Sequence, residues 1–225
     1  LDSLLGGSYD IKLFSGFDTC NATFNLLSWT LTASTSSSTS NGYNIDCFGD
    51  EARWLVALIS DTGMRLSEAA GLHIDDIKLE DEVPHIDLKP HAWRSLKTRG
   101  SQRQIPLVGA SLWAAQRIKE TKTESPYAFP RYTSAKGTNG NSASAAINKW
   151  LKPRVPEGCV IHSFRHSLRD RLRAVSCPSE MIDQIGGWAT AGVGQAYGEG
   201  YELDNTMHYM ITLESVEKNK KEGSS

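Results

Sequence analysis

Apolar residues recur at helical spacing along much of this chain. Ala52, Leu55, Val56 and Ile59 lie three or four residues apart, which predicts an amphipathic helix that ends at the polar residues 61–63. The same periodicity predicts further helices over 65–72, 111–121, 142–151, 163–175 and 180–185, with short ones near Gln195 and across 207–211. Most of the chain is therefore expected to be helical.

Strand-like segments occupy the stretch between the second and third of these helices. Residues 85–88, 92–98 and 104–108 are rich in strand formers, a turn is expected at 99–101, and Pro84, Pro90 and Pro106 mark the limits. This pattern predicts a small antiparallel sheet of three strands. The expected fold class is mainly α with a small antiparallel β-sheet (α+β).

The two ends of the chain are the least informative. Residues 1–49 include a Ser/Thr-rich run at 32–40, which favours a linker or surface segment, although the apolar residues of 24–31 could pack as a short helix or strand. The main domain is expected over 50–213, followed by a solvated tail at 214–225. Because the chain begins at Leu1, it is expected to be a fragment of a longer protein.

Neither membrane insertion nor a disulfide framework is predicted. The apolar stretch at 54–59 is too short to span a bilayer, and the first residues do not have the order of a signal peptide, so a cytoplasmic location is expected. The four cysteines have no CxxC spacing. Four reduced thiols are expected, although Cys20 and Cys47 could pair in an oxidising setting.

The charge distribution is more informative than the net charge of −2. Residues 89–131 carry nine Lys and Arg against two acids, 149–173 carry seven against two, and the remainder carries eight against 22. Two basic blocks could form one positive face that attracts an anionic partner such as DNA. Solvated helix faces would give the same counts, so charge alone leaves both interpretations open.

The helix expected at 163–175 carries an arginine stripe, with Ser163 as a plausible N-cap. Arg165, Arg169 and Arg173 share one face, which suits a track of phosphates but also ordinary i,i+4 ion pairs. His162 and His166 have the spacing of a zinc-binding HxxxH pair. Ser163 stands where a hydrolytic zinc site needs Glu, so no metal is expected, and His166 is predicted to be a packed or capping residue.

Five motifs occur in a fixed order over about residues 50–213: DTGMRLSEAAGL, SLKTRGSQRQIPL, HSFRH, GGWA and a tyrosine nine residues after the tryptophan. In this combination the sequence resembles the catalytic domain of the tyrosine recombinase (phage integrase) family. The resemblance implies the DNA breaking-rejoining fold of that family. It also implies active-site roles for Arg65, Lys97, His162, Arg165, Trp188 and Tyr197, with Glu68 as a supporting acid. The nearby Tyr201 is interpreted as an anchoring aromatic.

These residue types suit phosphoryl transfer. A tyrosine hydroxyl, with a pKa near 10, needs a base, for which His162 is the candidate. Arg65 and Arg165 would clamp the phosphate, Lys97 would protonate the leaving 5′ oxygen, and Trp188 would donate its indole N–H. Contacts to DNA are expected from the remaining arginines of the basic blocks, namely Arg94, Arg99, Arg103, Arg169 and Arg173.

The resemblance implies a site-specific recombinase or integrase that needs neither metal nor ATP. Its expected partners are double-stranded DNA and further protomers in a synaptic complex, with a monomer in the absence of DNA. Two alternatives remain open: a type IB topoisomerase, and a DNA-binding module without chemistry. The helix near 207–213 could pack on its own domain or on a neighbouring protomer.

Overall fold

A computed structural model describes residues 8–15, 18–25, 30–33, 50–98, 101–121, 124–153, 155–188 and 200–222; before Glu51 and after Ser215 it describes the backbone alone. In chain order the elements are β1 (Ser8–Ser15), β2 (Asp18–Asn25), β3 (Thr30–Ala33), α1 (Asp50–Thr62), α2 (Leu66–Ala70), the 3₁₀ helix η2 (Ile74–Asp76), β4 (Ile77–Lys78), β5 (His85–Leu88), β6 (Arg103–Pro106), α3 (Gly109–Glu120), β7 (Thr133–Ser134), β8 (Gly137–Thr138), α4 (Gly140–Leu151), α5 (Ser163–Ala174), α6 (Ser179–Gly186) and α7 (Leu203–Glu222).

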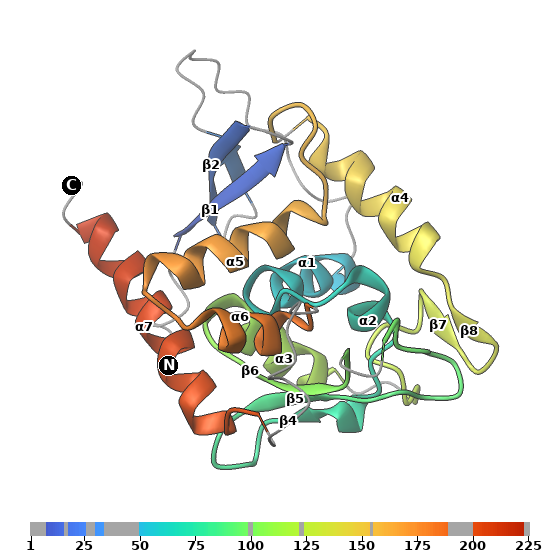
Figure 1. Ribbon diagram of the computed structural model, residues 1–225. Helices are drawn as coiled ribbons and strands as arrows, with labels where there is room; N and C mark the ends of the chain where they lie inside the picture. Colours follow the sequence, from blue (N-terminus) through green and yellow to red (C-terminus); the bar gives the residue numbers. More distant parts are fainter. Residues whose placement is uncertain are drawn as a thin grey trace.

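Helix α1 lies at the centre of the helical body (Figure 1), where α2, α3, α4 and α5 all contact it. Its predicted apolar face is buried, with Leu55 and Ile59 at most 1% exposed. The helix is followed by Gly63, whose φ of +60° favours glycine. A Cβ there would also lie 2.8 Å from the side chain of Leu168 on α5. Glycine therefore lets the two helices approach closely at this end of α1.

Helix α5 combines an apolar face with one buried ion pair. Phe164, Leu168 and Leu172 are fully buried, as the helical periodicity predicts. The Arg171 guanidinium donates to the carboxylate of Asp61, at 2.9 Å, and that carboxylate also accepts the backbone N–H of Ala110. The pair thus joins α5, α1 and the start of α3. Removing one partner of such a buried pair typically costs about 3–5 kcal/mol of stability.

The small sheet β4–β5–β6 is antiparallel, and it pairs Ile86 of β5 with both Ile77 and Ile105. The strands predicted at 85–88 and 104–108 are confirmed, although β6 starts one residue earlier and ends two residues earlier than predicted. The strand predicted at 92–98 is wrong, and β4 is the third strand instead. After Pro90 the backbone folds into a tight turn in which His91 pairs with Arg94, because Arg94 points inward rather than along a sheet face.

A second antiparallel sheet, β1–β2–β3, is formed within the segment for which the sequence predicted a linker or a short helix or strand. It lies beside α5 (Figure 1). Three strands therefore replace the expected linker over residues 8–15, 18–25 and 30–33. The question of a Cys20–Cys47 disulfide lies outside the described side chains, as does the short helix predicted near Gln195.

The last helix, α7, runs to Glu222 and so continues into the predicted tail. Lys and Glu, which are good helix formers, make up most of residues 214–222 and favour this extension. Met210 and Leu213 are 0% and 2% exposed, and the helix contacts β6 and α5 of its own domain. The mostly helical fold with small antiparallel sheets is confirmed. Among the described helices, none is long and apolar enough to cross a membrane.

Candidate active site

The carboxylate of Glu68 is the centre of a buried cluster of arginines at the start of α2. Its Oε2 accepts the backbone N–H of Arg65, and its Oε1 accepts the Arg65 guanidinium at 2.5 Å. Arg103 on β6 donates to Oε2 at 3.3 Å. Burial alone would raise the pKa of Glu68, but Arg103 and Arg65 outweigh it and lower the pKa. Glu68 therefore stays ionised and fixes both guanidinium groups.

One carbonyl oxygen brings the two predicted clamp residues together. Gly187, at the end of α6, adopts a φ of +64°, and its carbonyl accepts from Arg65 at 3.2 Å and from Arg165 at 3.4 Å. A Cβ on Gly187 would lie 2.6 Å from the Arg103 guanidinium. Both the backbone angle and the contact with Arg103 thus require glycine at this position.

Arg165 lies in the first turn of α5 and is only 2% exposed. It also donates to the carbonyl oxygen of Gly63, and its guanidinium carbon lies 4.4 Å from the centre of the Trp188 ring. Burial and the neighbouring Arg65 and Arg103 lower the pKa of Arg165 to about 9. The group is therefore still a cation at neutral pH, although its surroundings disfavour the charge.

Three guanidinium groups, those of Arg65, Arg103 and Arg165, surround the single carboxylate of Glu68. This leaves an excess of positive charge in a largely buried place, where an uncompensated charge is costly. A bound anion would relieve that cost. Arg65 retains 24% exposure of its side chain, so the cluster is reachable from the surface.

His162 lies next to this cluster, at the N-terminus of α5. The structure makes His162 the N-cap residue, and the predicted N-cap Ser163 instead accepts the backbone N–H of Val160 through its hydroxyl. Partial desolvation of the His162 ring, together with His166, Arg165 and Arg65, lowers the pKa of His162. A lowered pKa keeps the ring neutral at neutral pH, as the predicted role of His162 as a base requires.

A cavity of about 450 Å³ opens beside His162, between the start of α5 and the preceding loop. His166 is exposed there and meets His162 edge to face, with 5.0 Å between ring centres, so its predicted packing or capping role is wrong. Arg169 and Arg173 also line the cavity. No group of three or more His, Cys, Asp or Glu able to hold a metal ion occurs among the residues described.

The arginines expected to contact DNA divide into two groups. Arg94 and Arg103 are buried and ion-paired with Asp76 and Glu68, which is contrary to a surface contact with DNA. Arg169 and Arg173 are partly exposed, at 36% and 59% of their side chains, and pair with Asp183 and Asp170. Arg99 lies outside the described residues.

Among the remaining predicted residues, the structure describes Trp188, Lys97 and Tyr201. Trp188 is half-buried, and the guanidinium carbon of Arg169 lies 5.2 Å from the centre of its ring. Lys97 is exposed in the loop between β5 and β6, rather than on a strand. Tyr197 lies outside the described residues. Tyr201 is anchored: its hydroxyl donates to Glu180, and its backbone exchanges two hydrogen bonds with Gln184.

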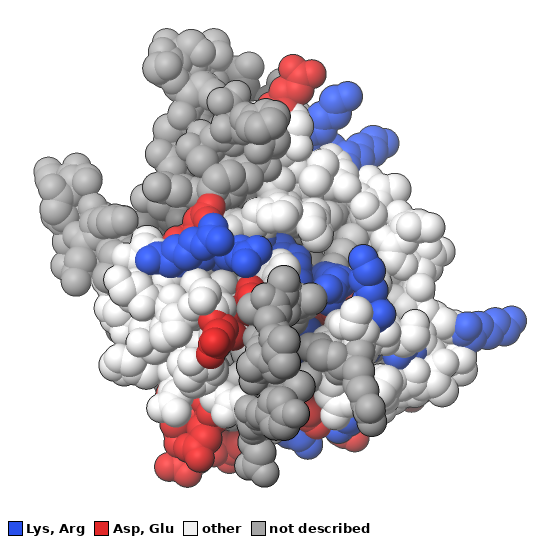
Figure 2. Space-filling view, viewed as in Figure 1, with Lys and Arg blue, Asp and Glu red and all other residues white. Residues whose placement is uncertain are grey.

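The surface agrees with a positive site on this side of the molecule. Figure 2 shows Lys and Arg side chains gathered in a band that runs from α5 towards α2.

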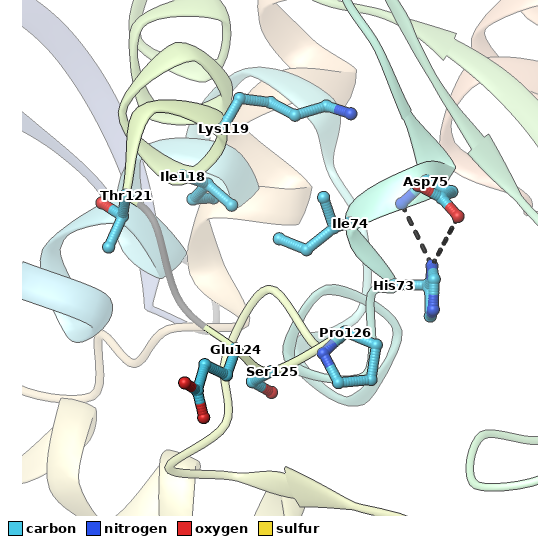
Figure 3. A pocket seen from close by; sticks show the side chains of 9 residues that line it. All are labelled: His73, Ile74, Asp75, Ile118, Lys119, Thr121, Glu124, Ser125 and Pro126. Carbon is cyan, nitrogen blue, oxygen red and sulfur yellow. Dashed lines mark hydrogen bonds and ion pairs between the residues drawn. The ribbon is translucent and has the colours of Figure 1, made fainter.

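A separate cavity of about 420 Å³, between η2 and the end of α3, has a different character (Figure 3). Ile74 and Ile118 line it together with Lys119 and two acids, Asp75 and Glu124, so it lacks a cationic cluster.

Sequence reasoning missed the parts played by the backbone and by Arg103. The carbonyl groups of Gly63 and Gly187 orient the clamp, and Arg103 holds Glu68 instead of contacting DNA. The glycines in DTG and GGW were visible signals, since glycine marks backbone with positive φ or close approach. Gly186 is an example, because a Cβ there would overlap the Trp188 ring at 1.8 Å.

Residues 35–202 match the phage integrase family. Several solved structures are similar at a TM-score below 0.5, and three of them illustrate the range. The Tn1549 transposon integrase in complex with circular intermediate DNA has 18% identity, a TM-score of 0.45, and coverage of 71% of this chain and 57% of that one. XerH site-specific recombinase bound to its difH substrate has 19% identity, a TM-score of 0.45, and coverage of 74% of this chain and 45% of that one. XerA recombinase has 16% identity, a TM-score of 0.42, and coverage of 78% of this chain and 66% of that one.

This chain thus spans about half the length of the first two of these structures. A search of curated proteins gives no match.

Proposed function

The chain belongs to the phage integrase family, and on that basis we propose that it is the catalytic domain of a tyrosine-type site-specific recombinase. It cuts and rejoins DNA strands through a covalent 3′-phosphotyrosine intermediate and uses neither metal nor ATP. The observation that carries this proposal is the arginine pocket, by which we mean the place where Arg65 and Arg165 meet at the Gly187 carbonyl, close enough to His162 for both to lower its pKa. Its excess positive charge suits a single phosphodiester.

The scissile phosphate would lie against Arg65 and Arg165. Its oxygens gain negative charge as the attacking oxygen approaches, and guanidinium groups stabilise spread oxygen charge with paired N–H donors. The Gly187 carbonyl holds both guanidinium groups, and the Gly63 carbonyl also holds that of Arg165. Both groups are therefore oriented towards one place before the substrate binds. Glu68 binds Arg65 directly and is itself bound by Arg103, so both residues help to fix the Arg65 guanidinium.

Tyr197 supplies the nucleophile in this proposal. Its hydroxyl oxygen forms the bond to phosphorus while the bond from phosphorus to the 5′ oxygen breaks. Neutral His162 accepts the phenolic proton, and Lys97 gives a proton to the departing 5′ oxygen. Trp188 donates its indole N–H to the phosphate and packs against Arg165. A foreign 5′ hydroxyl then reverses the step and exchanges strands.

The DNA would extend from this pocket along α5. Arg169 and Arg173 are one helical turn apart beside His162, and both are exposed enough to reach successive phosphates. Arg99 is a further proposed contact. The proposed partners are double-stranded DNA and other protomers in a synaptic complex, with a monomer in the absence of DNA. Such an activity belongs in the cytoplasm, with the DNA of a bacterium or mobile element.

The test is to incubate the chain with nicked duplexes that carry the junction sequences flanking its own gene. The expected product is a protein–DNA adduct that is sensitive to protease and attached at the 3′ end. Relaxation of supercoiled DNA without any preferred site would instead indicate a topoisomerase. Binding without an adduct on every junction duplex would favour a module without chemistry, and it would overturn the proposal.

The lowered pKa of His162 predicts the acid limb of the pH profile. A group whose pKa lies below the ordinary 6.5 stays neutral to lower pH, so a base at this position keeps working there. The adduct-forming rate should therefore fall to half of its plateau only at a pH below 6.5. His162→Gln should lower the plateau and remove this limb. A decline of the wild-type rate centred above pH 6.5 would contradict the assignment.

A further inference from the structure

The loop that joins β5 to β6 carries Lys97, and a buried arginine anchors the start of the segment that leads to it. Arg94 precedes Lys97 by three residues and is 3% exposed. Its guanidinium donates to the backbone carbonyl of Glu68 at 3.0 Å, to the carboxylate of Asp76 at 3.2 Å and to the carbonyl of Lys89. It therefore connects the loop to α2 and to η2.

The backbone around Arg94 is fixed as well. Arg94 and His91 exchange two backbone hydrogen bonds, of 2.9 and 3.1 Å. The His91 ring contacts the Asp76 carboxylate at 2.9 Å, and the Trp93 indole donates to the carbonyl of Gly71 at 3.1 Å. A Cβ on Gly71 would lie 2.7 Å from the Arg94 side chain, so the packing here is close.

The far end of the same segment is attached to the arginine cluster. The Ser101 hydroxyl accepts from Arg65 at 3.2 Å, and the Ser101 carbonyl accepts from Arg103 at 2.7 Å. Arg65 and Arg103 both bind the carboxylate of Glu68, whose backbone carbonyl is held by Arg94. Arg94 thus binds the Glu68 backbone directly, and Ser101 binds two arginines that hold the Glu68 carboxylate. Lys97 lies between Arg94 and Ser101 in the sequence.

We propose that Arg94 is a positioning residue that holds the loop so that the Lys97 ammonium group reaches the departing 5′ oxygen. This inference rests on the proposed function. Arg94 is suited to this role because its guanidinium group is buried and paired with Asp76. Its position therefore does not depend on bound DNA. Holding a catalytic group in place removes an entropic cost, and small misplacements lower rates by up to about a hundredfold.

The proposal is tested with two versions of the cleavable duplex from the adduct experiment. One has the natural 5′ oxygen at the cut, and the other has sulfur in its place. A thiol is far more acidic than an alcohol, so a sulfur leaving group needs no proton from Lys97. The variants are Arg94→Lys, Asp76→Asn and Lys97→Ala, with Arg117→Gln as an exposed control on α3 that pairs with Glu120. Thermal melting verifies that each one folds.

On the oxygen duplex, Lys97→Ala should slow cleavage by about a hundredfold or more, and Arg94→Lys and Asp76→Asn by about tenfold or more. On the sulfur duplex all three should cleave within about threefold of the wild type, since general-acid catalysis is bypassed there. Equal losses on both duplexes for Arg94→Lys and Asp76→Asn, with rescue confined to Lys97→Ala, would overturn the inference and leave the proposed function intact. Failure of the wild type to form an adduct on either duplex would overturn both.

Discussion

Replacing Tyr197 by Phe is expected to abolish the covalent adduct while leaving DNA binding intact. The substitution removes one oxygen, the atom that would form the bond to phosphorus, and it leaves the arginine pocket unchanged. Loss of a nucleophile typically lowers turnover by a factor of about a thousand or much more. The measurement is the yield of 3′-linked adduct on a nicked duplex, with an electrophoretic shift to verify binding of the same DNA.

Tyr201→Phe is the matched control, since Tyr201 is another tyrosine close in sequence. Its hydroxyl donates to Glu180, and desolvation together with that carboxylate raises the pKa of Tyr201, which makes the hydroxyl harder to ionise. The Tyr201→Phe variant should form adduct at close to the wild-type yield. A full yield from Tyr197→Phe, or a complete loss from Tyr201→Phe alone, would reverse the assignment of the nucleophile.

The second large effect is expected from Arg165. Arg165→Lys keeps a positive charge but cannot reach the carbonyls of both Gly63 and Gly187, and it lacks the paired donors that suit a phosphate. The loss of one such donor group from a transition-state pocket costs about 10²–10³ in rate. Single-turnover cleavage of the same duplex measures this effect. Arg165→Ala should lose at least as much.

Arg171→Lys provides the control for Arg165→Lys. Arg171 is also a buried arginine of α5 held by a carboxylate and a carbonyl, but its partners are Asp61 and Ser60. The Arg171→Lys substitution should therefore lower the melting temperature, while cleavage by the folded protein remains near normal. If Arg171→Lys slows cleavage as much as Arg165→Lys does, the effect comes from the packing of α5 and not from a phosphate contact.

Local sequence pattern predicted the helices well because their burial is periodic. Phe164, Leu168 and Leu172 form one apolar stripe, and the structure buries that stripe against α1. The strand predicted at 92–98 failed because its deciding contact is not local. Arg94 is drawn inward by Asp76, which lies 18 residues earlier, and no pattern within the segment reveals such a pairing.

The same reasoning applies to the candidate site. The identities of Arg65, Arg165 and Trp188 could be predicted from the order of the motifs, and the structure brings these three residues together. What holds them could not be predicted, because the acceptors are backbone carbonyls that any sequence possesses. Arg103 was misassigned as a DNA contact because a lone arginine in a basic block gives no sign of its buried partner Glu68.

The shared carbonyl of Gly187 sets a boundary for protein engineering. This main-chain atom accepts from both Arg65 and Arg165 and so fixes their spacing, which a side-chain substitution elsewhere leaves in place only if the backbone at Gly187 is unchanged. A library that varies other side chains of this domain should therefore keep the glycines at 63, 186 and 187 constant. Randomising those three glycines would yield misfolded or misaligned proteins before any new specificity could emerge.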